Sequence, residues 1–230
     1  MNNATSTLSF EHTFEGYLSA IYTALSEKLD VTELRSAKKS NALLFNEVRY
    51  IPAHREKARR VWDALNKKGT ANLRLVYFAF LSENEELLLP IYEYISLLFS
   101  AGHSDSPEKL QELRARLSPW AQRVENEKRK MEAALRFQPR QEELMCWRLS
   151  PVHNILPLLT RYCRDRFGSA PWMLIDTKRK YGLRKSAAGV EYFLPGVDSL
   201  DSSERSADKS LGEREPGFSP RGRHPLQAAV

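Results

Sequence analysis

The sequence predicts an α+β protein in which a mostly helical bundle packs on a small antiparallel sheet. Apolar residues recur at helical spacing over most of the chain, which indicates several amphipathic helices. Short apolar runs bounded by turn residues gather near both ends of the chain and are typical of strands. The hydrophobic share of 42% and the charged share of 28% are ordinary for a globular protein.

The helices are expected where apolar residues line one face of a segment. Thr13 is placed to cap the first helix, and Ser106-Pro107 opens a later one as an N-cap followed by proline. That later helix is expected to bend or break at Pro119, because proline removes a backbone donor. The expected helices cover Phe14–Leu29, a segment after Pro52, segments that begin at Thr70 and near Asn84, a segment from Pro107, and Asn154–Phe167.

The strands are expected to form one small antiparallel sheet on which the helices pack. The last three are predicted to form a closing meander, with turns at Thr177–Lys180 and Ala187–Gly189. The expected strands are Leu8–Phe10, Phe45–Ile51, Leu144–Leu149, Trp172–Asp176, Tyr181–Arg184 and Glu191–Leu194.

The domain prediction is a flexible N-terminus at residues 1–7, one folded domain at 8–196 and a disordered polar tail at 197–230. The tail is rich in Ser, Gly, Pro and charge, so it has little apolar surface to bury. We expect a cytoplasmic protein with no membrane contact, because no apolar run is long enough to span a bilayer and no signal peptide is visible. Cys146 and Cys163 lack metal-ligand or redox spacing, so both are expected to be structural thiols.

Positive charge is concentrated in two stretches of the chain. Lysine and arginine number 35 against 29 acidic residues, and a basic body of this kind favours an acidic partner, with nucleic acid foremost. The alternative for both stretches is a solvated helix face with a polar turn. The predicted nucleic-acid-binding residues are Arg161, Arg164, Lys178, Arg179, Lys180 and Arg184 in the stretch from Arg161 to Lys185, and Arg136 in the stretch from Arg123 to Arg140.

Three residues are candidates for acid–base chemistry. His153 follows a proline-containing turn at a helix start, where free backbone amides favour anions; the alternative is that Asn154 caps this helix and His153 is an ordinary loop residue. Asp176 ends a strand as a catalytic carboxylate or as a salt-bridged turn residue. Glu15 lies beside Gly16, which permits close approach, or simply belongs to a capping turn.

Several segments together resemble a bacterial family assigned to DNA metabolism. They are Thr13-Phe14-Glu15-Gly16, Lys57 to Trp62, Met131 to Phe137, Pro151 to Leu159, Arg166-Phe167, and Trp172 to Asp176 with Arg179 and Gly182. Members of that family accompany a radical-SAM protein, and a related domain precedes a uracil-DNA-glycosylase-like domain in longer chains. The resemblance covers about residues 8–195 and implies an α+β fold and a role in DNA repair or modification, with no catalytic residue to carry over.

The predicted function is therefore that of a DNA-metabolism accessory protein that contacts nucleic acid, a radical-SAM partner, or both. We expect no cofactor and no metal, because an iron–sulfur cluster of the radical-SAM kind needs three cysteines and the chain has two. One alternative is a nucleic-acid-processing enzyme that uses His153, Asp176 and Arg179. Another is a helical protein-interaction scaffold. His153 is expected to bind phosphate rather than carry protons, because the sequence places no second titratable group beside it.

Overall fold

The computed structural model describes residues 5–37, 48–100, 107–137, 145–186 and 189–195. Within these residues it has six α-helices and two small sheets, with strands near both chain ends, so the predicted α+β class is confirmed. Residue contacts group the chain into two compact units, Met1–Asn126 and Glu127–Val230, which are described separately below. The single domain expected over residues 8–196 stays a prediction, and the tail at 197–230 lies outside the described residues.

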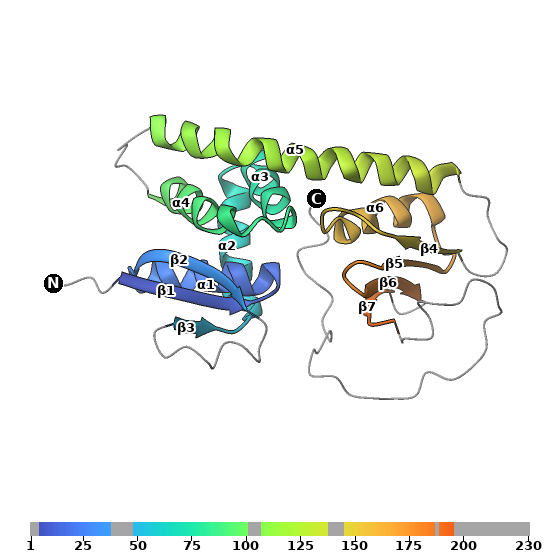
Figure 1. Cartoon of the computed structure of the whole chain (residues 1–230), viewed down its shortest axis with the longest axis horizontal. Coiled ribbons are helices and arrows are strands. Elements are labelled where there is room, and N and C mark those ends of the chain that lie inside the picture. Colours follow the sequence, from blue (N-terminus) through green and yellow to red (C-terminus); the bar gives the residue numbers. More distant parts are fainter. Residues whose placement is uncertain (1–4, 38–47, 101–106, 138–144, 187–188, 196–230) are drawn as a thin grey trace. The chain divides into compact units, whose positions relative to one another are not determined.

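The first unit contains a three-stranded sheet with the order β2-β1-β3, in which all pairing is parallel (Figure 1). The strands are β1 (Thr5–Glu11), β2 (Asp30–Ala37) and β3 (Val48–Ile51). The prediction of one antiparallel sheet is wrong here, because helix α1 (Phe14–Ser26) returns the chain so that β2 runs in the same direction as β1. The sequence did not predict β2, in which Leu34 is the single buried residue.

Helices surround an aromatic core in the first unit. The remaining helices are α2 (Arg55–Lys67), α3 (Thr70–Leu81), the short 3₁₀ helix η2 (Glu85–Leu87) and α4 (Leu88–Phe99). The ring centroid of Phe14 lies 4.8 Å from that of Tyr77 and 6.2 Å from that of Trp62. The buried hydroxyl of Tyr17 donates to the carbonyl oxygen of Leu88 at 2.6 Å. These contacts join α1 to α2, α3 and α4.

Helix α5 runs without interruption from Pro107 to Phe137 and passes through Pro119. The predicted break at Pro119 is therefore wrong. Proline removes one backbone donor, but Leu117 and Ala121 are buried on either side of it and hold the helix together. The boundary between the two units falls within α5, so the last part of this helix, from Glu127 onward, belongs to the second unit.

The second unit contains a four-stranded sheet with the order β4-β5-β6-β7. Its strands are β4 (Met145–Leu149), β5 (Trp172–Asp176), β6 (Tyr181–Ser186) and β7 (Gly189–Phe193), and α6 (Leu156–Phe167) connects β4 to β5. The β5-β6-β7 meander is antiparallel, as predicted, whereas β4 pairs with β5 in parallel. The carboxyl ends of β4 and β5 therefore lie side by side.

No helix in the described ranges is long and apolar enough to cross a membrane. Three of the polar residues that the sequence predicted as functional, His153, Asp176 and Arg179, lie around the carboxyl ends of β4 and β5.

Candidate functional site

The candidate site lies where β4 and β5 end in the second unit. Leu149, the last residue of β4, is the register partner of Asp176, the last residue of β5. The next residue, Thr177, donates to the carbonyl oxygen of Leu149 from its backbone amide at 2.9 Å and from its hydroxyl at 3.1 Å. This register places the loop after β4, which contains His153, beside the turn after β5, which contains Arg179.

Asp176 organises the turn between β5 and β6. Its side chain is fully buried, and Oδ1 accepts hydrogen bonds from the backbone amides of Lys178 and Arg179, both at 2.9 Å. Short bonds of this kind from an aspartate to the backbone two and three residues later are what makes aspartate a turn-forming residue. Its other oxygen, Oδ2, accepts from the guanidinium of Arg179 at 2.9 Å. The geometry therefore matches the salt-bridged turn residue that was the alternative to a catalytic carboxylate.

Arg179 connects this turn to the loop after β4. Its guanidinium donates to the carbonyl oxygens of Pro151 at 3.2 Å and Val152 at 2.8 Å, in addition to its ion pair with Asp176. The side chain is 12% exposed, so most of its donors point into the protein. The neighbouring Lys178 is exposed and places its ammonium 3.0 Å from the same carbonyl of Val152. Arg179 thus holds the loop in place, while Lys178 borders it at the surface.

Glu127, in the last part of α5, binds the loop from a second direction. One carboxylate oxygen accepts from the amide of Val152 at 2.6 Å, and the other accepts from the amide of His153 at 2.9 Å. The latter oxygen also lies 2.5 Å from Nδ1 of the His153 ring. Burial raises the pKa of Glu127, but the hydrogen bonds from the two amides and the imidazole outweigh it, so the net pKa is lowered.

This arrangement corrects two expectations about the loop. The amides predicted to attract an external anion are already occupied by the chain's own carboxylate, Glu127. Asn154 does not cap α6 with its side chain; its Oδ1 accepts from the hydroxyl of Tyr181 at 2.5 Å, and Ile155 is the N-cap residue. Sequence reasoning missed Glu127, which lies 26 residues from His153 in the chain.

The His153 ring is bonded to Glu127 through its Nδ1 atom. An ionised carboxylate is only an acceptor, so Nδ1 of His153 must carry a proton to bond with Glu127. The atom Nε2 has no hydrogen-bond partner among the described residues, and it is not one of the buried polar atoms that lack a partner. The His153 side chain as a whole is 13% exposed.

Glu15, the third acid–base candidate, belongs to the first unit. The hydroxyl of Thr13 accepts from the amide of Gly16 at 2.9 Å, which confirms the predicted cap of α1. A Cβ atom at Gly16 would lie far inside van der Waals distance of the carbonyl oxygen of Glu11, so only glycine fits there. Burial, followed by the negative charge of Glu11, raises the pKa of Glu15 despite the nearby positive charge of Arg55. These contacts describe a capping turn and do not include His153 or Asp176.

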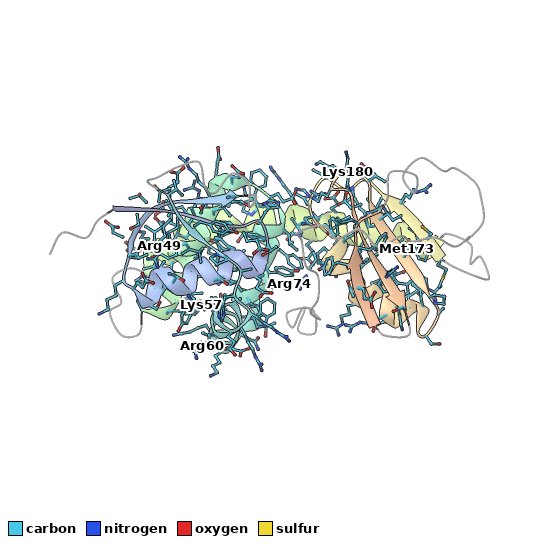
Figure 2. The ribbon with its side chains drawn as sticks, turned by 90° about the horizontal axis from the view of Figure 1, so that it is seen from below. Arg49, Lys57, Arg60, Arg74, Met173 and Lys180 are labelled. Atoms are coloured by element: carbon cyan, nitrogen blue, oxygen red, sulfur yellow. The ribbon has the colours of Figure 1, made fainter. Side chains whose placement is uncertain are left out.

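The remaining predicted cations of the second unit differ in how freely they present their charge. Arg161 pairs loosely with Asp165 at 3.8 Å, and both side chains are mostly exposed. Arg184 pairs with Glu191 at 3.3 Å. Arg164 and Lys180 are exposed and have no ion-pair partner among the described residues. Lys180 is labelled in Figure 2. The side chain of Arg136 lies outside the described residues.

The excess positive charge of the chain belongs to the second unit. Residues 1–126 contain 16 lysines and arginines and 16 acidic residues, so this unit is neutral. Residues 127–230 contain 19 lysines and arginines against 13 acidic residues, which accounts for the whole net charge of +6.

The first unit has cations of its own, Lys57 and Arg60 on α2 and Arg49 on β3, which are labelled in Figure 2. The ammonium of Lys57 and the guanidinium of Arg60 lie 5.9 and 5.8 Å from the ring centroid of Tyr22, and Arg60 donates to its hydroxyl at 3.0 Å. Arg49 forms a two-bond ion pair with Glu27. These cations already have partners within their unit, and the sequence analysis did not predict them as binding residues.

Among the described residues, no group of three or more His, Cys, Asp or Glu side chains is arranged to hold a metal ion. At the candidate site, Glu127 and Asp176 instead use their oxygens to accept hydrogen bonds from the loop and the turn.

Comparison with known proteins identifies the family. The profile of a domain of unknown function, DUF4130, matches residues 85–213, which is more than half of the chain. This chain belongs to the DUF4130 family. The matched range includes all the residues of the candidate site, from Glu127 to Tyr181, so the site is part of the family domain.

No curated protein matches the chain. Among solved structures, two of RecJ from Thermus thermophilus are similar to it, one in complex with Mg²⁺ and one with Mn²⁺. They are 11% and 10% identical in sequence, with TM-scores of 0.42 and 0.45. Each match covers 79% of this chain but 42% and 44% of the RecJ chains, so the chain spans less than half their length. Similarity this low carries no argument about the function of a DUF4130 protein.

Proposed function

We propose that this DUF4130 protein is an accessory protein of DNA metabolism that binds nucleic acid through its second unit. The observation that carries the proposal is the charge distribution: the first unit is neutral, and the second has the entire net charge of +6. Lysine and arginine neutralise backbone phosphates and release counterions, which makes a basic unit of this kind suited to a polyanion.

The exposed cations are the residues proposed to contact phosphate. Arg161 and Arg164 lie three residues apart on α6, so they share a helix face, and Lys180 follows the turn after β5. The ion pair of Arg161 with Asp165 is long and exposed, so it is weak. The guanidinium of Arg161 therefore remains available to bind a phosphate. Arg179 has a different role, since its donors are used to position the loop that contains His153.

The proposed partner is a radical-SAM protein, and the support for it is the sequence resemblance described above. The chain has two cysteines, one fewer than the three that an iron–sulfur cluster of the radical-SAM kind needs. Radical chemistry would therefore belong to the partner, and any base excision to a separate uracil-DNA-glycosylase-like protein. The partnership with a radical-SAM protein is tested by mixing the full chain with that protein and asking whether the two elute together in size-exclusion chromatography.

Salt-dependent DNA binding tests the proposed function. The full chain is titrated into a labelled duplex of about 20 base pairs, and into its single strand, at several salt concentrations. Replacing Arg161, Arg164 and Lys180 by Gln should lower the slope of log affinity against log salt by up to ~3, about 0.9 for each phosphate that is no longer neutralised. The matched control replaces Lys67, Lys68 and Arg116, three exposed cations of the first unit, and should leave the slope nearly unchanged. Equal losses in both variants, or no binding, would contradict the proposal; no binding would leave the protein-interaction scaffold.

A nucleic-acid-processing enzyme is the second candidate, and the Glu127–His153 pair is the observation that favours it. A carboxylate at Nδ1 is the arrangement in which histidine carries protons through Nε2 in many enzymes, and Nε2 of His153 has no hydrogen-bond partner among the described residues. Of the predicted catalytic set, His153 alone keeps a free functional atom, because Asp176 and Arg179 bind each other and the loop. Incubation of the full chain with damaged DNA tests this candidate, and His153→Gln should then reduce turnover by ~10²–10⁴-fold.

A further inference from the structure

We propose that the sheet face that carries Arg184 and Phe193, named the Arg184 face, binds a single strand of nucleic acid by stacking a base on these two side chains. This inference rests on the proposed function and deepens it, because it names unpaired bases as the ligand of the second unit.

The two faces of the sheet in the second unit differ in what covers them. Side chains along a strand point alternately to the two faces. Trp147 and Leu174 are register partners in β4 and β5, and both are buried. The ring of Trp147 stacks on that of Phe167 in α6, with 4.9 Å between the ring centroids. Helix α6 therefore covers this face, and the residues that alternate with Trp147 and Leu174 form the opposite one, the Arg184 face.

The register aligns the side chains of the Arg184 face in two rows across the strands. One row contains Met173, Arg184 and Glu191. The adjacent row contains Arg148, Ile175, Gly182 and Phe193. The side chains of Arg148 and Glu191 are exposed, and those of Met173, Arg184 and Phe193 are half-buried. Met173 is labelled on this sheet in Figure 2. Several side chains of the face are therefore accessible to a ligand.

Phe193 and Arg184 provide neighbouring surfaces for stacking. A Cβ atom at Gly182 would lie 2.4 Å from two ring atoms of Phe193, so the ring lies directly against the backbone of β6. The guanidinium carbon of Arg184 lies 6.0 Å from the centroid of the same ring. Proteins that bind unpaired bases stack them on aromatic rings and on the planes of arginine guanidinium groups.

The charges of the Arg184 face suit the phosphates of the same strand. Arg148 and Arg184 contribute two positive charges, and Glu191 contributes one negative charge. The pair between Arg184 and Glu191 is 3.3 Å long, with side chains that are 40% and 45% exposed, so it is weak. Cations beside an aromatic surface are the combination by which proteins bind single strands. A duplex keeps its bases stacked inside and offers this face its phosphates.

This contact is separate from the one proposed for Arg161 and Arg164. Those two residues belong to α6, which covers the opposite face of the sheet. Because the two sets of residues share no partner, their effects on binding should be independent. The stacking contact can therefore be tested without removing the phosphate contacts of α6.

The experiment compares two oligomers with the same number of phosphates. The full chain is titrated with a thymidine oligomer of about 12 nucleotides and with an abasic oligomer of the same length. The wild type should bind the thymidine oligomer about tenfold more tightly, the effect of one stacked base. Phe193→Leu should abolish this preference and leave the dependence of affinity on salt unchanged, because it removes a ring and no charge.

Two matched variants show whether the ring and its face are responsible. Phe193→Tyr retains an aromatic ring and should retain the preference for the thymidine oligomer. Tyr192→Leu removes the neighbouring ring of β7, which belongs to the opposite face, and should also retain it. Met173→Glu leaves the contact of Phe193 with Gly182 in place, so it tests the same face if Phe193→Leu does not fold. It should weaken binding of the thymidine oligomer roughly fivefold, as one negative charge close to a phosphate does in water.

Three results would overturn this inference. The first is equal binding of the two oligomers by the wild type, and the second is an unchanged preference in Phe193→Leu. Either leaves the proposed function standing if duplex binding still depends on salt. The third is a wild-type dimer that Phe193→Leu converts to a monomer in analytical ultracentrifugation, which would assign the Arg184 face to a second copy of the chain. No binding of any DNA by the wild type would overturn both the inference and the proposed function.

Discussion

Glu127 binds both the backbone and the side chain of His153 through one oxygen, which accepts from the amide at 2.9 Å and lies 2.5 Å from Nδ1 of the ring. The side chains are 14% and 13% exposed, so the pair is largely removed from water. His153, which was predicted to donate a hydrogen bond to phosphate, is thus bonded to a carboxylate of its own chain. The consequence is that the ring orientation is set before any ligand arrives.

Glu127→Gln should destabilise the protein by about 2 kcal/mol at neutral pH, because a charged acceptor of three hydrogen bonds is lost. The pKa of Glu127 is lowered in the folded state, so its contribution is present above the unfolded pKa of about 4.3 and is lost as the pH falls through the lower folded value. The difference between wild type and variant should therefore shrink below about pH 4. Urea unfolding at a series of pH values measures it, with the exposed Glu112→Gln as control. A difference that stays constant into acid would contradict the assignment.

Arg179→Ala should lower stability by about 3–5 kcal/mol, because it leaves the fully buried carboxylate of Asp176 without its ion-pair partner. It also removes the donors to Pro151 and Val152 that position the loop. Lys180→Ala, at the neighbouring exposed position, should change stability by no more than about 0.5 kcal/mol. Chemical unfolding of both variants gives the comparison. Similar values for the two would mean that Arg179 is a surface residue in solution.

The two cysteines should differ in reactivity toward a thiol reagent. Cys146 is exposed, whereas Cys163 is buried and burial raises its pKa to about 12. We expect one thiol to react in the native protein and both to react in urea, as measured by the absorbance of the released reagent. Cys146→Ser should abolish the native reaction. A second native thiol with the kinetics of the first would show that α6 opens readily.

Gly16→Ala should destabilise the first unit by about 1–3 kcal/mol, although alanine favours helix by about 1 kcal/mol over glycine. The added Cβ would clash with the backbone carbonyl of Glu11, and a backbone atom has little freedom to move. Asn66→Ala, at an exposed position of α2, should be neutral or slightly stabilising. Thermal unfolding by circular dichroism compares the two, and a raised melting temperature for Gly16→Ala would refute the close contact.

Features that depend on neighbouring residues could be predicted from the sequence. The cap at Thr13, the end of α6 at Phe167 and the strand Trp172–Asp176 all follow from local patterns, and all are confirmed. The direction of pairing between β1 and its neighbours is not local, because it depends on where the chain goes after each strand. Pro119 is a second case. Proline removes a backbone hydrogen bond locally, but the helix stays continuous because the flanking residues Leu117 and Ala121 are buried.

The candidate site shows the same division. His153, Asp176 and Arg179 were found from residue type and position at element ends, and the structure gathers all three around the ends of β4 and β5. Glu127 could not be found in this way, because the sequence of a helix does not show which of its carboxylates contacts a distant loop. His153 lies 26 residues further along the chain. The sequence placed no second titratable group beside His153, and the structure places Glu127 there.

The parallel sheet of the first unit has a consequence for the order in which the chain folds. β1 is the central strand, yet one of its partners, β3, is reached only at the Thr7–Val48 pairing, 41 residues later. The meander of the second unit closes over much shorter distances, as in the Gly182–Phe193 pairing 11 residues apart. Loop closure over short distances is faster, so the meander should form early. During synthesis, Leu8 and Phe10 of β1 are therefore made before β3, and their pairing with β3 forms only after residues 48–51 have been added.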